Sequence, residues 1–399
     1  MGLLASPKPD AHLIYKASPK AGTMMNKNSD TETDDQADGR KAFSIVKTYS
    51  DMGYHRTGTN TDIATIDWLA GMLRNAGAEV TCPHFSYRHY DAAVTVTINE
   101  HSIEAMALHY AYTGTTTISH PAFGEVNGHD AEDDISNAVI TAIKTAKKHD
   151  HDGLILTTNS PDETLCGINR QCCEVFDFPV ILIGRKDRQR VRENPAQITI
   201  SATAQDQTAR NIVAQFRSSK NTDQPLILTT PVSGWFNCAG ERGCGIAISL
   251  ILAEKLSAHC PVDLLLASGH ELGFAGGYHL ARTYDRTPHA IVHLGSSIAN
   301  IGAEMTSVCT APSGQFSRIS KVLNTLEIRP ARPRDVLNPD GWVGESMCWA
   351  PKNRPMLSIA GISQHFHTPL DLAESVTTPD LLETAIERTF QATRILIEK

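Results

Sequence analysis

Acidic, basic and imidazole side chains follow several strand-like segments of this chain, and their types suit acid–base or metal chemistry. Glu241 and Arg242 follow the run PLILTT, whereas His270 and Glu271 come one glycine after the run VDLLLAS. His367 lies in HFHTPLD, after the run PMLSIA. Two carboxylates and an imidazole could hold a zinc ion, and histidine is a common general base. We therefore take these five residues as candidates for a catalytic or metal site.

Each candidate also has a structural interpretation that the sequence leaves open. Glu271 could form a buried salt bridge with Arg242, and Glu241 could stabilise a helix start through the helix dipole. His270 could donate to a carboxylate instead of acting as a base. Other polar residues are expected at the same edge of the sheet, and they are weaker candidates: His293, Glu345 and His365.

The elements that would position these residues alternate between strands and helices. From residue 211 onward, the runs NIVAQF, PLILTT, VDLLLAS, AIVHLG and PMLSIA are separated by helical stretches. This pattern predicts an α/β fold with a mainly parallel, mixed sheet sandwiched by helices. Ligands of such folds bind beyond the carboxyl ends of the strands, which is where the candidates stand.

Three segments have helical periodicity, with apolar residues three or four positions apart. The first follows Asn60, the second lies within GIAISLILAEKL, and the third follows Thr378, a typical N-cap residue. Their predicted buried faces consist of Ile63, Ile66, Leu69 and Leu73; of Ala247, Leu250 and Ile251; and of Leu382, Ala385, Ile386, Phe390 and Ile395.

Composition divides the chain into three regions. Residues 1–40 are mostly polar towards their end and are expected to be a flexible leader. Residues 41–95 and 205–399 are predicted to form the α/β domain that carries the site. Residues 96–204, with the buried strand-like runs DGLILTT and FPVILIG, are predicted to form an inserted, smaller, β-rich subdomain.

The overall composition excludes some classes of partner. The 399 residues are 41% hydrophobic and carry a net charge of −8, so there is no overall attraction for nucleic acid or an anionic membrane. No apolar run approaches the length of a membrane span, and the N-terminus lacks the pattern of a secretory signal, so a cytoplasmic location is expected. The nine cysteines lack paired zinc-site spacing and are expected to be reduced. A small-molecule or short-peptide substrate is expected, and a homo-oligomer stays open.

Several motifs in order carry a resemblance to a known family. LLLASGHELGFAGGYHLA, followed about a hundred residues later by FHTPLDLAESV, resembles the co-catalytic zinc aminopeptidases, metallopeptidase family 28. ARNIVAQF, PLILTT, ERGCGIA, ASGHELG and HTPLD occur in the order of that family. The family includes the glutaminyl cyclases by divergence, and many members carry a protease-associated domain that the insertion resembles.

The resemblance implies a role for each candidate. Glu241 matches a metal-bridging aspartate, Glu271 matches a metal-binding glutamate, and His367 matches the last metal-binding histidine. His270 stands where the family has its catalytic glutamate. Three further positions depart from the pattern, because a metal-binding histidine, the aspartate that supports it and a second metal-binding aspartate are replaced by Val232, Gly234 and Gly295.

The sequence therefore predicts a hydrolase of the zinc aminopeptidase type that acts on an amide bond of a small molecule or short peptide. Glu241, Glu271 and His367 are expected to hold one zinc ion, with Asp371 orienting His367. His270 is expected to be the general base, and Arg242 could bind a substrate carboxylate. Two alternatives stay open. One is a lyase or acyl-transfer enzyme of the cyclase type, and the other is a catalytically silent binding protein whose metal site has decayed.

Overall fold

The computed structural model describes residues 37–130, 132–170, 176–218, 224–324, 327–330, 341–342 and 344–398. Most of the predicted leader, residues 1–36, lies outside these ranges, and so do Cys172 and Cys173. Within the described ranges, no helix has both the length and the apolar composition to cross a membrane. The cytoplasmic location stays a prediction.

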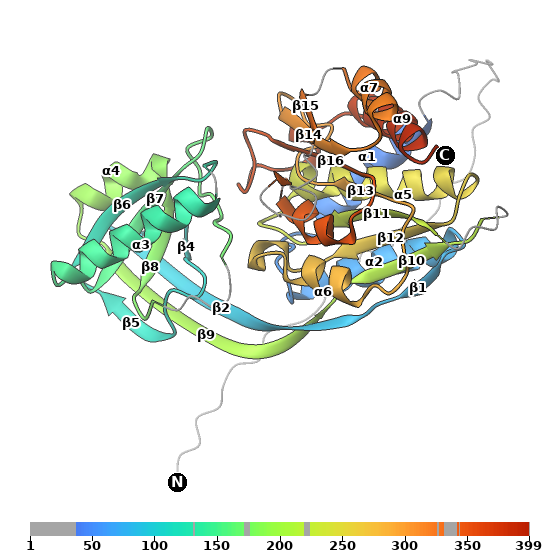
Figure 1. Ribbon diagram of the computed structural model, residues 1–399. Helices are drawn as coiled ribbons and strands as arrows, with labels where there is room; N and C mark the ends of the chain where they lie inside the picture. Colours follow the sequence, from blue (N-terminus) through green and yellow to red (C-terminus); the bar gives the residue numbers. More distant parts are fainter. Residues whose placement is uncertain are drawn as a thin grey trace, which may run out of the picture. The chain divides into compact units, whose positions relative to one another are not determined.

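An eight-stranded mixed sheet is the largest element of the fold (Figure 1). Its order is β1 (Glu79–Thr81), β10 (Ile212–Phe216), β12 (Val262–Ala267), β11 (Leu226–Pro231), β13 (Ala290–Leu294), β16 (Met356–Ile362), β14 (Glu304–Thr310) and β15 (Glu327–Pro330). The four central strands β12, β11, β13 and β16 are parallel, whereas β1, β10 and β14 pair antiparallel with their neighbours. The predicted α/β class is confirmed, and the five predicted strand runs are all strands.

Helices cover both faces of this sheet (Figure 1) because its central strands alternate buried side chains between two cores. Leu226 and Leu228 of β11 pack into one core, and Ile227 between them packs into the other. The first core includes side chains of α1 (Ala37–Asp51), α2 (Asn60–Asn75), α5 (Cys244–Ser257), α7 (Ser313–Val322), α8 (Ala373–Val376) and α9 (Pro379–Leu396). The second includes α6 (Ala275–Thr283) and the 3-10 helix η6 (Gly344–Lys352).

The three predicted helices are α2, α5 and α9. α5 is buried almost all round, which explains why its apolar residues extend beyond a single stripe. In α2, Ile66, Leu69 and Leu73 are buried as predicted, but Ile63 is 46% exposed, so that part of the prediction is wrong. Ile63 lies 60° from Ile66 on the side opposite to Leu69, as follows from about 100° per residue, and thus falls at the margin of the buried face.

The N-cap of α9 provides a test of local stability. The Thr378 side chain accepts a hydrogen bond from the Leu381 backbone N–H, and Pro379 occupies the first helical turn. We expect Thr378→Ala to lower the free energy of unfolding by about 1 kcal/mol, because it removes a partner from an otherwise unpaired N–H. Denaturant unfolding measures this change. Thr384→Ala, an exposed threonine within the same helix, is the control and should leave stability nearly unchanged.

The segment between β1 and β10 contains two four-stranded sheets. One has the order β3 (His101–Ile103), β2 (His84–Ile98), β9 (Gln197–Arg210) and β5 (Gly114–Ile118), and the other has β4 (Ala105–Ala107), β8 (Val180–Gly184), β7 (Gly153–Asn159) and β6 (Pro121–Asn127). The helices α3 (Glu132–Lys148) and α4 (Arg188–Glu193) and the 3-10 turn η2 (Arg185–Asp187) belong to the same segment. The predicted boundaries, at residues 95 and 205, fall inside the long paired strands β2 and β9. The domain division, with its protease-associated type of insert, stays a prediction.

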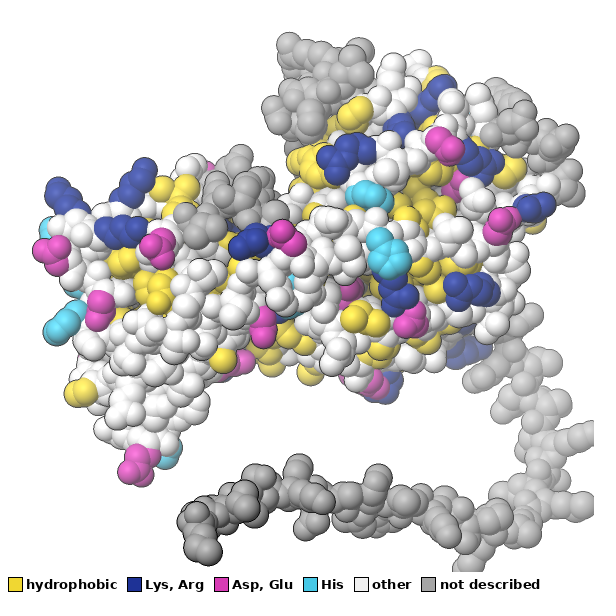
Figure 2. All heavy atoms as spheres, turned by 90° about the horizontal axis from the view of Figure 1, so that it is seen from below, with side chains coloured by type: hydrophobic (Ala, Val, Ile, Leu, Met, Phe, Trp, Pro, Cys, Tyr) yellow, Lys and Arg dark blue, Asp and Glu magenta, His cyan; other side chains and the backbone are white. Residues whose placement is uncertain are grey.

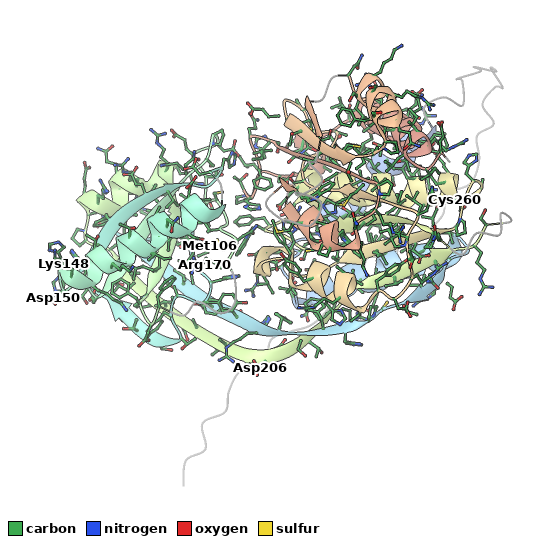
Figure 3. The ribbon with its side chains drawn as sticks, in the orientation of Figure 1. Met106, Lys148, Asp150, Arg170, Asp206 and Cys260 are labelled. Atoms are coloured by element: carbon green, nitrogen blue, oxygen red, sulfur yellow. The ribbon has the colours of Figure 1, made fainter. Side chains whose placement is uncertain are left out.

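Long strands and mixed surface charge characterise this part of the chain. β2 and β9 pair antiparallel along fourteen positions, from His84–Arg210 to Thr97–Gln197. Arg88 of β2 forms an exposed ion pair with Asp206 of β9, which is labelled in Figure 3. On the face of the molecule in Figure 2, acidic and basic side chains are interspersed with apolar ones. A small-molecule or short-peptide substrate, without nucleic acid or membrane as a partner, stays a prediction.

Candidate functional site

A pocket of about 580 Å³ lies beyond the carboxyl ends of the parallel strands. Four of its lining residues carry titratable groups that the sequence placed at this edge: His270 after β12, His293 in β13, Glu345 in η6 and His367 after β16. Residues 167–169 and others from the segment between β1 and β10 form part of its wall. The pocket is therefore built from both parts of the sequence, around a cluster of imidazoles.

Glu241 and Arg242 are positioned by an unusual turn between β11 and α5. Cys238 adopts the left-handed conformation with φ 31°, and residues Ala239–Gly243 form a π-helical turn, η3, before α5 begins. Asp371 accepts hydrogen bonds from the backbone N–H groups of Gly240 (2.6 Å) and Glu241 (2.9 Å). Both Glu241 and Arg242 are buried as a result. Wide helical turns of this kind occur frequently at functional sites.

Arg242 is anchored to its own turn and to the end of β11. Its Nε donates to the Ser233 carbonyl oxygen at 2.9 Å, and its Nη1 donates to the Glu241 carbonyl oxygen at 3.4 Å. Its Nη2 donates to Glu241 Oε1 and forms an ion pair in which both side chains are fully buried. Arg242 is not among the residues that line the pocket. Its predicted role in binding a substrate carboxylate stays a prediction.

His367 contacts Glu241 through one ring nitrogen and the inserted segment through the other. Its Nε2 lies 3.0 Å from Glu241 Oε1, and its Nδ1 lies 3.2 Å from the Gly167 carbonyl oxygen. The Gly167 N–H in turn donates to the His367 carbonyl oxygen at 2.8 Å. The structure therefore brings Glu241 and His367 together as predicted. Asp371 was expected to orient His367, which is wrong, because the hydrogen bonds of Asp371 go to the helix start.

Glu271 is held by hydroxyl and backbone donors and makes no ion pair with Arg242. Its Oε1 accepts from the Thr57 N–H at 2.7 Å, and its Oε2 accepts from the Ser233 hydroxyl at 2.8 Å. The Ser233 oxygen also accepts from the N–H groups of Gly269 and His270, at 2.8 and 3.1 Å. Arg170, labelled in Figure 3, donates its backbone N–H to the Glu271 carbonyl oxygen at 3.1 Å. This hydrogen-bonded network positions the loop after β12.

His270 and Glu345 form the pair of titratable side chains that faces the pocket. His270 Nδ1 lies 3.1 Å from Glu345 Oε2, and the imidazole packs against the ring of Phe274. Burial, together with the charge of Arg242, lowers the pKa of His270 well below its usual value. Burial raises the pKa of Glu345 to about 8, against the opposing effect of Arg242. Neutral forms of both side chains are therefore favoured near neutral pH.

The charge of Arg242 also reaches the other buried groups of the site. Burial alone would raise the pKa of Glu241, but the charges of Arg242 and His367 outweigh it and hold this pKa below its usual value. Burial and the charge of Arg242 lower the pKa of His293 to about 3. Glu241 is therefore a carboxylate and His293 a neutral imidazole near pH 7.

The three predicted ligands do not fit a zinc ion in this arrangement. Glu241 Oε1 is shared between Arg242 and His367, and both oxygens of Glu271 accept hydrogen bonds from protein donors. Among the carboxylate oxygens of Glu241 and Glu271, only Glu241 Oε2 is buried without a hydrogen-bond partner and thus free to bind an ion. Among the described residues, no group of three or more His, Cys, Asp or Glu side chains is placed to hold a metal.

Some residues of the site carried no signal that could be recognised in the sequence. Ser233 and Thr57 donate hydrogen bonds to Glu271, and the Gly167 carbonyl oxygen contacts His367. None of these three residues belongs to one of the motifs that carry the resemblance. At Gly167, a Cβ atom would lie 2.4 Å from Trp235 Cγ, so only glycine lets this segment approach the site. Of the weaker candidates, His365 contacts Asp162 at 2.8 Å instead of joining the cluster.

The buried carboxyl group of Asp62 lies next to the hydrogen-bonded network of Glu271 and is expected to make the stability of the folded chain depend on pH. Its carboxylate accepts from the Ser268 hydroxyl and the Gly58 N–H, yet burial raises its pKa to about 7. The folded state thus binds this proton more tightly than the unfolded chain, so the contribution of Asp62 to stability falls as the pH rises from about 4 to about 7. We expect Asp62→Asn to remove up to about 4 kcal/mol of this decline.

Denaturant unfolding at several pH values measures the effect of Asp62→Asn. Asp371, whose pKa burial also raises to about 7, should leave part of the slope in place. Asp67→Asn, which changes an exposed carboxylate on the same helix, is the control. An identical pH slope in wild-type protein and Asp62→Asn would contradict the prediction.

Comparison of the sequence with known proteins finds one curated relative that is named as a probable aminopeptidase. No family model matches the chain. The probable lipoprotein aminopeptidase LpqL of Mycobacterium tuberculosis (strain ATCC 25618 / H37Rv) is 25% identical over 263 residues, which make up 58% of this chain and 52% of that protein. The chain thus spans about half the length of the curated relative it matches.

Solved structures of other proteins are similar to this structure over most of the chain. A peptidase M28 precursor from Shewanella amazonensis SB2B matches with a TM-score of 0.69 and 15% identity, over 92% of this chain and 96% of that chain. The zinc aminopeptidase BSAP from Bacillus subtilis matches with a TM-score of 0.67 and 14% identity, over 89% and 94%. The chain therefore has the fold of the zinc aminopeptidases, and the resemblance inferred from the motifs is confirmed at the level of the fold.

Proposed function

We propose that the chain is a peptidase-type hydrolase that acts on an amide bond of a short peptide or small molecule bound beside His270 and Glu345. The observation that carries the proposal is the contact of these two side chains, 3.1 Å apart, at the wall of a pocket beyond the strand ends. The aminopeptidase fold supports the same class of reaction. The curated relative is also named as a probable aminopeptidase.

In this function, His270 is the general base. With a proton on Nδ1 donated to Glu345 Oε2, its Nε2 carries the lone pair and accepts a proton from water. The water oxygen bonds to the carbonyl carbon of the substrate, the carbon–nitrogen bond breaks, and Nε2 returns the proton to the leaving amine. Glu345 is a positioning residue that holds the imidazole ring through Nδ1.

The pocket lining favours a substrate that combines an apolar side chain with a positively charged group. Apolar side chains form much of the wall: Ile135, Ile168, Phe274, Met305, Met347 and Phe366. Asp130, Glu304 and Glu345 are the lining residues with carboxyl groups, and the lining contains no lysine or arginine among the described residues. A free amine would find complementary charge at Asp130 or Glu304. We therefore propose short peptides with a free N-terminus and an apolar first residue.

A peptide library with mass detection tests this function. Hydrolysis cleaves the peptide and adds the mass of one water across the products, whereas the cyclase-type alternative removes ammonia or water. Glu345→Ala should lower kcat with little change in KM, because alanine removes the hydrogen-bond partner that orients His270 Nδ1 without removing a substrate contact. Glu254→Gln, in an exposed ion pair with Lys41, is the control. If the wild-type chain cleaves no peptide, the proposed hydrolysis is wrong, and if Glu345→Ala keeps the wild-type kcat, Glu345 does not position the base.

A second candidate function, binding without turnover, is favoured by the Arg242–Glu241 ion pair. In this function the same pocket holds a peptide, but the Glu241 carboxylate is neutralised by Arg242 and takes no part in catalysis. Peptides that bind by calorimetry to the wild-type chain without being cleaved would support it. The cyclase-type alternative, the zinc ion and the oligomeric state stay predictions.

A further inference from the structure

We propose that Arg242 is a built-in cation that takes the place of the predicted zinc ion, so that the folded chain takes up no zinc at Glu241, Glu271 and His367. The guanidinium is buried and donates to Glu241 Oε1, the oxygen that also lies 3.0 Å from His367 Nε2. This inference goes beyond the proposed function and is independent of whether the substrate is hydrolysed.

Three hydrogen bonds fix the guanidinium at the position where it neutralises Glu241. Nε is held by the Ser233 carbonyl oxygen, Nη1 by the Glu241 carbonyl oxygen, and Nη2 by Glu241 Oε1. An arginine side chain stays charged at every accessible pH. A divalent ion bound to Glu241 would therefore meet a fixed positive charge in a buried environment, where repulsion is strong.

Arg242 lies beside Gly234, a position where the resemblance places a carboxylate. A Cβ atom at Gly234 would lie 3.3 Å from Cys238 Sγ and in ordinary contact, at 3.4 Å, with Arg242 Nε and Glu241 Oε2, so position 234 directly borders the ion pair. Val232, where the resemblance places a metal-binding histidine, is fully buried in the apolar core. Neither position 232 nor position 234 therefore offers a side chain that could bind a metal ion beside Glu241.

The remaining predicted ligand needs no ion to offset the cost of its burial. Glu271 accepts from the Thr57 N–H and the Ser233 hydroxyl, one donor for each carboxylate oxygen. A buried carboxylate is tolerated when such donors satisfy it. Both oxygens of Glu271 are therefore satisfied by the protein itself, whereas Glu241 has one satisfied oxygen, Oε1, and one buried oxygen, Oε2, without a partner.

Zinc content and thermal unfolding of the full chain test this inference without reference to turnover. The wild-type chain, Arg242→Gln and Arg286→Gln are purified without chelator, and bound zinc is measured by mass spectrometry of the metal. Melting is then recorded in zinc chloride and in EDTA. Arg286→Gln is the matched control, because Arg286 pairs with the buried Asp263 outside the site. It also reports adventitious zinc bound at surface histidines or cysteines.

We expect less than about one-tenth of a zinc ion per chain in the wild type and in Arg286→Gln, with equal melting in zinc and EDTA. Arg242→Gln should gain about one ion per chain and melt at a higher temperature in zinc, since an ion that binds only the folded state stabilises it. About one zinc per wild-type chain, lost in EDTA with a lower midpoint, would overturn the inference. So would a folded Arg242→Gln that takes up no zinc. If that variant does not fold, the wild-type measurement decides alone.

Discussion

Arg242→Met is expected to lower the free energy of unfolding by about 3–5 kcal/mol, because it removes one partner of a fully buried ion pair. Methionine fills much of the same volume but donates no hydrogen bond. The Glu241 carboxylate would keep only its contact with His367, and the carbonyl oxygen of Ser233 would lose its donor. Urea unfolding of the variant and the wild type measures the difference.

Two further variants separate the ion pair from side-chain volume. Combining Glu241→Gln with Arg242→Met removes both charges and should recover part of the lost stability, since no unpaired buried charge remains. Arg286→Met should cost less, because Arg286 is about one-third exposed and Asp263 keeps its hydrogen bonds from Tyr284 and Gln215. An Arg242→Met variant no less stable than Arg286→Met would contradict our description of the site.

The fold could be predicted largely because its central strands are buried on both faces. Mostly apolar runs such as VDLLLA and AIVHL are typical of such strands, and the polar residues that follow them mark the edge of the sheet. α9 was recognisable from its cap and its stripe. Ile63 was wrongly predicted to be buried, because periodicity shows which side of a helix is apolar but not how much of that side is covered by the rest of the protein. Domain boundaries were harder, since β2 and β9 extend beyond positions 95 and 205 without a change in composition.

The site could be predicted only in part, because spacing along the chain does not specify which groups satisfy one another. Glu241 and His367 do meet, although they are 126 positions apart. The partner of Arg242 could not be predicted from the sequence: Glu271 was considered, whereas the structure pairs Arg242 with the adjacent Glu241. Gly167 lies in a region assigned to another subdomain, and its contact with His367 depends on tertiary packing. Hydrogen bonds from Thr57 and Ser233 similarly leave no motif.

The change at His270 is expected to have the largest effect on activity. His270→Gln should lower kcat for amide hydrolysis by about 10²–10⁴-fold, because the amide cannot accept and return the proton of the attacking water. KM should change little, since the base contributes mainly in the transition state. The variant should remain folded, as the glutamine side chain can still hydrogen-bond Glu345. Steady-state kinetics on the best peptide of the library, together with thermal melting, measures both effects.

His120→Gln, which alters an exposed histidine on the chain segment between β5 and β6, is the control for His270→Gln and should keep wild-type kinetics. Turnover that survives in His270→Gln would place the base elsewhere, whereas a loss confined to KM would make His270 a binding group. The result is also informative alongside zinc content. Turnover that requires His270 in a chain without zinc would mean that the aminopeptidase fold can support amide hydrolysis with an imidazole base and a buried guanidinium–carboxylate pair.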